Sequence, residues 1–224
     1  MFRFEMGRIG GIPIYLDMFF VLILVLFSYP YFTAGSSQAI SMGFVIVVGI
    51  LVSILLHELG HAFAGRLFKA NVSHIELTGL GGIAHFERSL PPSVLARTVI
   101  FLAGPAANLA LYWGFDWLAQ LAMGNGALMM ARPFLVLAGT NLFLMIFNLL
   151  PAYPLDGGHT LDAWLGAVLG PYWATRIVGG LGLVIAVLVG LWAFSGQMFF
   201  MLFVAFFIGQ SSWEAFQSAN RWRR

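Results

Sequence analysis

Six stretches of apolar residues, each long enough to cross a lipid bilayer as a helix, dominate this sequence. A membrane helix needs about 20 apolar residues to span roughly 30 Å of hydrocarbon. Only 9% of the 224 residues are charged, against about 25% in an average soluble domain. So few ionic groups exclude an ordinary soluble globule, a disordered chain and a nucleic-acid binder. The sequence predicts an all-α polytopic membrane protein with six transmembrane helices, at residues 17–34, 41–66, 95–120, 132–152, 172–194 and 197–217.

The rest of the chain leaves little room for other domains. The N-terminus does not resemble a cleaved signal peptide, because its apolar run begins only near Asp17. The chain contains no Cys, so thiolate metal sites and disulfides are excluded. The apolar stretch 160–169 is too short to cross alone and is expected to continue the fourth crossing. We expect a single integral-membrane domain over 1–224, with a core at 41–169 and two further transmembrane helices in 170–224.

The basic residues predict the orientation of the chain. Ten of the eleven Lys and Arg residues lie on alternate connections, and only Arg132 lies on the other side. By the positive-inside rule, both termini and the connection 67–94 are expected in the cytosol. The ten are Arg3, Arg8, Arg66, Lys69, Arg88, Arg97, Arg176, Arg221, Arg223 and Arg224.

The long cytosolic connection shows a strand pattern. Residues 71–77 and 83–87 alternate between apolar and polar side chains, and the Gly-rich segment between them is typical of a turn. This predicts a small membrane-associated β-hairpin after the second transmembrane helix. Residues 8–16 are a candidate third strand, which Pro13 would restrict to an edge of the sheet.

The second span carries the first chemical signal, His57-Glu58-Leu-Gly-His61. Histidines at i and i+4 lie on one face of a helix and can bind one metal ion. Glu58 can then accept a proton from a water that the metal activates. The alternative is that these residues are polar contacts between helices. Ionisable groups in a membrane helix are costly and are functional by default, which favours a metal site.

A catalytic zinc usually has three protein ligands, so a third is expected. Asp156 is favoured, because the fourth span ends in a segment broken by Pro151 and Pro154 at about the depth of the histidines. Its alternative role is an N-cap for the helix at 160–169. The full set of candidates is His74, His85, Asp116, Asp156, His159 and Asp162.

Taken together, these motifs resemble the site-2 protease family of intramembrane zinc metalloproteases. Asp156 lies 95 residues after His61, in Asn148-Leu-Leu-Pro-Ala-Tyr-Pro-Leu-Asp-Gly-Gly158. Ala103-Gly-Pro-Ala-Ala-Asn-Leu109 is similar to the family's Gly-Pro-x-x-Asn segment. The chain carries neither the PDZ insertion of one branch nor the CBS domain of another. It therefore resembles a minimal form, close in plan to the sporulation-type group.

The resemblance implies that His57, His61 and Asp156 bind one Zn2+ and that Glu58 is the catalytic general base and acid. It implies hydrolysis of a peptide bond within or near the transmembrane segment of a membrane-protein substrate, as in regulated intramembrane proteolysis. The expected partners are that substrate, the lipid bilayer of a prokaryotic cell and regulatory membrane proteins, with no nucleic acid.

Other polar groups have open roles. Asn108 and Asn148 are candidate donors to the substrate backbone or oxyanion, or amide contacts between helices. His159 is a candidate neighbour of the site, whereas His74 and His85 are interpreted as surface or structural groups. The alternative functions are a membrane metal-ion transporter and a non-proteolytic metal-binding membrane protein. Metal transport does not require a general base, so a transporter would not need a glutamate fixed between two ligands. A prenyl-protein endopeptidase would lack the segment around Asp156.

Overall fold

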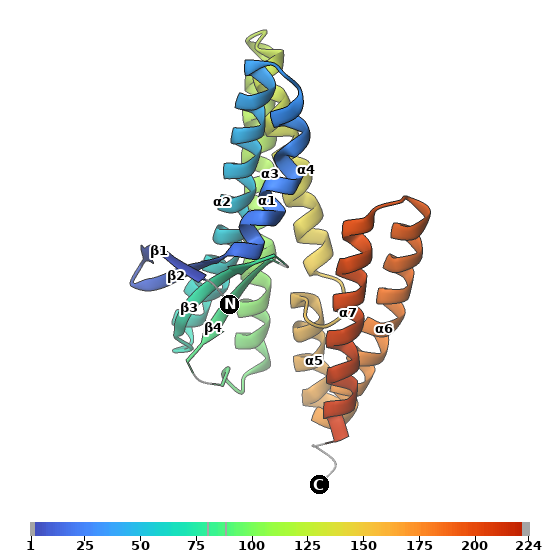
Figure 1. Cartoon of the computed structure of the whole chain (residues 1–224). Coiled ribbons are helices and arrows are strands. Elements are labelled where there is room, and N and C mark those ends of the chain that lie inside the picture. Colours follow the sequence, from blue (N-terminus) through green and yellow to red (C-terminus); the bar gives the residue numbers. More distant parts are fainter. Residues whose placement is uncertain (1–2, 80, 88, 221–224) are drawn as a thin grey trace. The chain divides into compact units, whose positions relative to one another are not determined.

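The structure is a computed structural model that describes residues 3–79, 81–87 and 89–220. Most of the described chain is helical, with one small sheet (Figure 1). The strands are β1 (Arg3–Ile9), β2 (Ile12–Asp17), β3 (Val72–Thr78) and β4 (Gly81–Phe86). The helices are α1 (Met18–Thr33), α2 (Ser37–Leu67), α3 (Val94–Gly124), α4 (Leu128–Asn148), α5 (Asp156–Leu169), α6 (Pro171–Ser195) and α7 (Phe199–Ser218).

Five of the described helices, α2, α3, α4, α6 and α7, are long and apolar enough to cross a membrane. They correspond to five of the six expected spans, and with them the chain is an integral membrane protein. The remaining expected span, 17–34, corresponds to α1, whose 16 residues reach about 24 Å at 1.5 Å per residue. It begins at Met18 because Asp17 ends β2 and caps the helix, accepting a hydrogen bond from the Phe19 N–H at 3.0 Å.

The four strands form one sheet in the order β1-β2-β3-β4. The strands expected at 71–77 and 83–87 are found as the antiparallel pair β3 and β4. The expectation of one further edge strand at 8–16 was wrong: two strands form there, and β2 lies inside the sheet between β1 and β3. Pro13 is tolerated in β2 because the parallel pairing with β3 covers only residues 14–16, so no hydrogen bond to β3 is lost.

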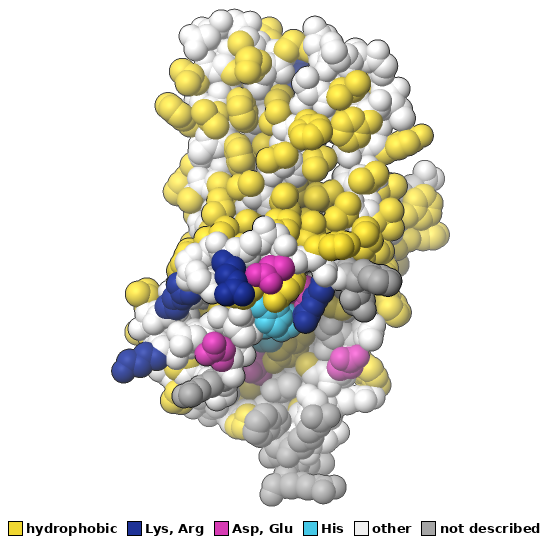
Figure 2. All heavy atoms as spheres, turned by 60° about the vertical axis from the view of Figure 1, so that its left-hand side comes forward, with side chains coloured by type: hydrophobic (Ala, Val, Ile, Leu, Met, Phe, Trp, Pro, Cys, Tyr) yellow, Lys and Arg dark blue, Asp and Glu magenta, His cyan; other side chains and the backbone are white. Residues whose placement is uncertain are grey.

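The chain divides into two compact units, with one boundary just before α3, one inside α3 and one inside α4. The first unit contains residues 1–90 and 103–145. Its core lies between the sheet, the start of α1 and α2, and its buried strand residues alternate along β2 and, after an irregularity that follows Val72, along β3. The buried members of the core are Ile12, Ile14, Phe20, Leu24, Leu59, Ala62, Val72, Ile75 and Leu77. On the face shown in Figure 2, charged side chains gather over the sheet, whereas hydrophobic side chains cover the helices.

The second unit contains residues 91–102 and 146–224. Its helices α6 and α7 approach closely at small residues: a Cβ on Gly179 would lie 2.9 Å from the Ser212 carbonyl oxygen. Ser212 is fully buried and donates a hydrogen bond to the Tyr153 carbonyl at 3.1 Å. This contact fixes the segment between α4 and α5 against α7.

Candidate metal centre

His57 and His61 lie one turn apart in the second half of α2 and are each 6% exposed. Their ring planes cross at 83°, and their Nε2 atoms are 3.1 Å apart. Two nitrogens that bind the same tetrahedral zinc at about 2.0–2.1 Å are roughly 3.3 Å apart. The two imidazoles therefore already have the separation that a shared metal ion requires.

A glycine of α3 leaves the space in front of these nitrogens open. A Cβ on Gly104 would lie 2.7 Å from His57 Nε2 and 2.5 Å from His61 Cε1. Any larger residue would place its side chain against the metal-binding atoms. The donor set and this space fit a small divalent cation. Pro105 follows Gly104 within the same helix; both belong to the segment 103–109 that resembles the family's Gly-Pro-x-x-Asn motif.

Glu58 is 5% exposed and lies next to the histidine pair on α2. Its carboxylate lies against the backbone of β4, where a Cβ on Gly82 would come within 2.6 Å of Oε1. The close approach of α2 to β4 therefore depends on glycine at this position. Sheet and helix together enclose the carboxylate in the first unit.

A chain of buried polar side chains leads away from His57 inside the first unit. His57 Nδ1 is 2.5 Å from Asn108 Oδ1 on α3, and Asn108 Nδ2 donates to Asn141 Oδ1 on α4 at 2.9 Å. Asn141 Nδ2 donates to Ser53 Oγ on α2 at 2.8 Å. The three residues that this series of hydrogen bonds connects to His57, namely Asn108, Asn141 and Ser53, are all 0% exposed. Asn141 and Ser53 were not among the site residues predicted from the sequence, although a lone Asn in an apolar span is a detectable signal.

In the second unit, α5 begins at Asp156, which is 9% exposed. The N-cap position belongs to Leu155, so the alternative role of Asp156 as the N-cap is wrong. As an acid in the first helical turn it is favoured by the helix dipole. The two glycines that follow let the preceding segment fold back onto this turn: a Cβ on Gly158 would lie 2.6 Å from the Ala152 carbonyl carbon. Asn148 is the last residue of α4 and is half-buried.

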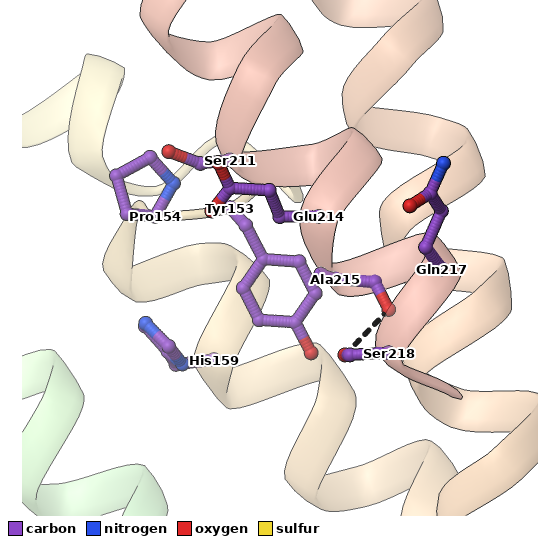
Figure 3. A pocket seen from close by; sticks show the side chains of 8 residues that line it. All are labelled: Tyr153, Pro154, His159, Ser211, Glu214, Ala215, Gln217 and Ser218. Carbon is purple, nitrogen blue, oxygen red and sulfur yellow. Dashed lines mark hydrogen bonds between the residues drawn. The ribbon is translucent and has the colours of Figure 1, made fainter. Parts of the chain in front are cut away.

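His159 follows on α5 and packs between two aromatic rings of the same unit. It stacks on Phe101 at 4.9 Å and meets Tyr153 edge-on at 5.1 Å between ring centroids. It also lines a hollow of about 670 Å³, shown in Figure 3, where Ser218 donates to the Ala215 carbonyl at 2.9 Å. The lining residues are Tyr153, Pro154, His159, Ser211, Glu214, Ala215, Gln217 and Ser218.

The remaining ligand candidates have other contacts. His74 and His85 face each other across β3 and β4, with parallel rings 4.3 Å apart. Asp116 on α3 accepts a hydrogen bond from Gln120 at 2.5 Å. Asp162 on α5 accepts one from Thr175 at 3.1 Å.

Comparison with known proteins identifies the family. A buried histidine pair with an adjacent glutamate, on a helix of membrane-spanning length, is typical of an integral membrane protein with a candidate metal centre. A family model described as Peptidase family M50 matches residues 45–127 and 115–191. The chain belongs to this family, and the resemblance to site-2 proteases is confirmed.

Curated relatives agree with this assignment. A zinc metalloprotease of Methanocaldococcus jannaschii is 30% identical over 210 residues, which cover 92% of this chain and 58% of the relative. Stage IV sporulation protein FB of Bacillus subtilis is 29% identical over 112 residues, covering 50% of this chain and 37% of that protein. The chain spans about half the length of the curated relatives it matches.

A solved structure has the same fold. The site-2 protease from Methanocaldococcus jannaschii superposes with a TM-score of 0.70 at 24% sequence identity. The match covers 96% of this chain and 95% of that one.

Proposed function

We propose that this protein is an intramembrane zinc metalloprotease, a single integral-membrane domain that hydrolyses a peptide bond within or near the transmembrane segment of another membrane protein. The observation that carries the proposal is the buried pair His57 and His61, with Nε2 atoms 3.1 Å apart beside Glu58. Membership of peptidase family M50 and relatives named zinc metalloproteases support it.

In this proposal His57, His61 and Asp156 hold one Zn2+. Two observations support Asp156 as a ligand. It lies in the segment 148–158 that resembles the site-2 protease family, and it is buried at the first residue of α5. Bound zinc would supply a Lewis acid for the scissile carbonyl and make water easier to deprotonate. Glu58 accepts the proton of the attacking water and passes it to the leaving amine. Asn148 is proposed as a donor to the substrate backbone, from its place in the same segment.

The substrate arrives as a transmembrane helix whose carbonyl groups are already hydrogen-bonded. Hydrolysis therefore requires local unwinding. The free edge of β4, at the end of the sheet, is a surface on which an extended segment could pair by backbone hydrogen bonds. The lipid bilayer of a prokaryotic cell and a membrane-protein substrate are the proposed surroundings.

The proposed topology has six spans, made by α1 and the five longer apolar helices, and places both termini in the cytosol. The support is that ten of the eleven basic residues lie on alternate connections between the expected spans, although Arg88, Arg221, Arg223 and Arg224 lie outside the described residues. Accessibility labelling of single cysteines introduced at Ser73 and Ser218 should report the cytosol for both. Labelling of Ser73 from outside would contradict this orientation.

Replacing Glu58 tests the proposed chemistry. Glu58→Gln keeps the size of the side chain but removes the proton acceptor, and general acid–base catalysis contributes typically 10²–10⁴-fold to rate. We expect cleavage to fall by at least about 10²-fold while zinc content is unchanged. The assay co-expresses the chain with tagged single-span membrane proteins and follows their fragments, with zinc measured by mass spectrometry.

A matched control is Glu76→Gln, which changes a glutamate of β3 beside His85 and should leave cleavage intact. Near-normal cleavage by the zinc-loaded Glu58→Gln protein would refute the proposed role. Zinc flux into liposomes that is the same for wild type and Glu58→Gln, without cleavage by either, would identify a transporter instead.

A further inference from the structure

We infer that Asn141 and Ser53 act as positioning residues: they fix the orientation of the Asn108 amide, which in turn selects the nitrogen of His57 that faces the metal. The inference rests on the proposed role of His57 as a zinc ligand. It concerns a hydrogen-bonded circuit that runs through three helices, from Ser53 on α2 to Asn141 on α4, Asn108 on α3 and back to His57 on α2.

A backbone carbonyl determines which groups in this circuit donate hydrogen bonds and which accept them. One end of the Asn141 amide lies 2.9 Å from the Leu137 carbonyl oxygen, one turn earlier in α4. A carbonyl oxygen only accepts hydrogen bonds, so the amide end that faces it must be Nδ2. The same Nδ2 has a second hydrogen for Ser53 Oγ. Ser53 donates its own proton to the Gly49 carbonyl at 2.7 Å, which leaves its oxygen free to accept.

This anchor determines the remaining atoms in turn. With Nδ2 committed to Leu137 and Ser53, Asn141 presents Oδ1 to α3, and only a donor can face it. Asn108 must therefore turn Nδ2 towards Asn141 and Oδ1 towards His57. An oxygen there requires that His57 carries its proton on Nδ1. The other nitrogen, Nε2, then has a lone pair, and it is this atom that lies 3.1 Å from His61 Nε2.

Because these side chains are buried, a reversed orientation of either amide would be costly. Ser53, Asn108 and Asn141 are all 0% exposed, so water has no access with which to satisfy a reversed amide. Reversing either amide would place two donors or two acceptors face to face, and a buried unsatisfied polar group is costly. The approach of α4 to α2 is itself close, because Gly49 leaves space for the Leu137 side chain.

The circuit assigns Asn108 a different role from the substrate contact considered from sequence. Both ends of its amide are engaged within the protein, one by His57 and one by Asn141. An acceptor on the outer nitrogen of a metal-binding histidine orients the ring, and losing such a partner typically costs 10–100-fold in metal affinity. Asn108 is thus a positioning residue in this scheme.

The experiment measures zinc affinity of the purified full chain by competition with a chromogenic chelator. Asn108→Leu removes the acceptor at similar volume and should weaken zinc binding by about 10–100-fold. Asn108→Asp still accepts from His57 Nδ1 but donates nothing, and should bind zinc at least about tenfold more tightly than Asn108→Leu. Asn141→Leu should weaken binding by about tenfold, the low end of the same range, because its effect passes through Asn108. Thr140→Val, its neighbour on α4, should leave affinity unchanged.

A spectroscopic measurement separates positioning from simple packing. In zinc-loaded protein with 15N-labelled histidine, His57 should show a proton on Nδ1 and metal on Nε2 in the wild type. That signature should change in Asn108→Leu and persist in Asn108→Asp. A metal bound through Nδ1 of His57 in the wild type would overturn the inference, as would wild-type zinc affinity in both Asn108→Leu and Asn141→Leu.

The outcomes also separate this inference from the proposed function. If His57→Ala leaves zinc binding intact, the proposed zinc site is wrong. If His57→Ala abolishes zinc binding but the asparagine variants bind normally, only the circuit is wrong. Thermal melting and size-exclusion profiles identify a variant that fails to fold, and Asn108→Asp and Asn141→Leu then still test the assignment from opposite ends.

Discussion

The first unit contains two histidine pairs, each with a nearby glutamate, and their geometries differ. On α2, His57 and His61 have ring planes at 83° and are 6% exposed. On the sheet, His74 and His85 have ring planes at 10° and centroids 4.3 Å apart. The side chain of His85 is 39% exposed, and its Nε2 lies 3.4 Å from a carboxylate oxygen of Glu76.

The ligand atoms of His74, Glu76 and His85 also lie within 4.8 Å of one another, but the ring geometry leads us to expect metal binding at the α2 pair and not at the sheet pair. The lone pair of an imidazole nitrogen lies in the plane of its ring. Crossed planes let two lone pairs converge on one point, whereas parallel stacked planes direct them side by side. An i, i+4 spacing on a helix supports the first arrangement, and direct cross-strand pairing supports the second.

The largest expected contrast between the two pairs is in zinc content. His57→Ala and His61→Ala should each reduce zinc from about one per chain to a small fraction, because each removes a proposed zinc ligand. His74→Ala and His85→Ala should retain the wild-type content. Mass spectrometry of the purified proteins measures all four. Loss of zinc from either sheet variant would show that the stacked pair also binds metal.

Asp156 belongs to the same test. Asp156→Ala should lower zinc content as the histidine variants do, if it is the third ligand. Full retention of zinc would transfer that role to another residue, and His159→Ala is the variant to measure next.

A smaller effect is expected from filling the space beside the metal pair. Gly104→Ala places a methyl group within 2.7 Å of His57 Nε2 and should weaken zinc affinity by about 10-fold or more, comparable to losing a supporting contact. Gly114→Ala is the matched control on the same helix, because a Cβ there meets open space. It should bind zinc normally and stabilise the helix by roughly 0.5–1 kcal/mol. Equal affinity in both variants would contradict the assigned position of the ion.

The smallest effect concerns the stacked pair itself. Burial lowers the pKa of His74 below its ordinary value of 6.5, the neighbouring His85 and Arg3 lower it further, and Glu76 opposes them. Tyr15 contacts the ring edge-on at 5.5 Å. Because the folded pKa lies below the unfolded one, stability is retained above pH 6.5 and decreases as the pH falls below it.

Nuclear magnetic resonance of labelled histidine should therefore find a His74 titration midpoint below 6.5. Arg3→Gln should move this midpoint upward, and zinc content should be the same for both proteins. A wild-type midpoint above 6.5 would contradict the expected sign.

Much of this architecture could be predicted from sequence, for identifiable reasons. Long apolar runs predicted six helices that the structure contains, and five of them are long and apolar enough to cross a membrane. The thickness of the bilayer sets this minimum length of apolar sequence. Alternation predicted β3 and β4. The extra strand was missed because Gly10 and Gly11, which have positive φ values of 57° and 82°, allow a tight turn within what reads as one segment. That turn separates β1 from β2.

The site was predicted unevenly. The spacing of His57 and His61 was enough to predict their shared face, since helix geometry alone determines it. The contact from His57 to Asn108 spans 51 residues, and that from Ser53 to Asn141 spans 88. Such pairings depend on how α2, α3 and α4 pack. A single sequence contains no direct signal for them.

The closeness of Gly82 to Glu58 links the register of β4 to the environment of the proposed general base. Side chains alternate along β4, and a slip of one residue in its pairing with β3 would bring Ile83 to the place that Gly82 occupies. A branched apolar side chain would then be forced against the carboxylate. The strands could still pair through their backbones in the shifted register. Such an error in pairing would therefore disturb the proposed base without removing either the sheet or the helix that carries Glu58.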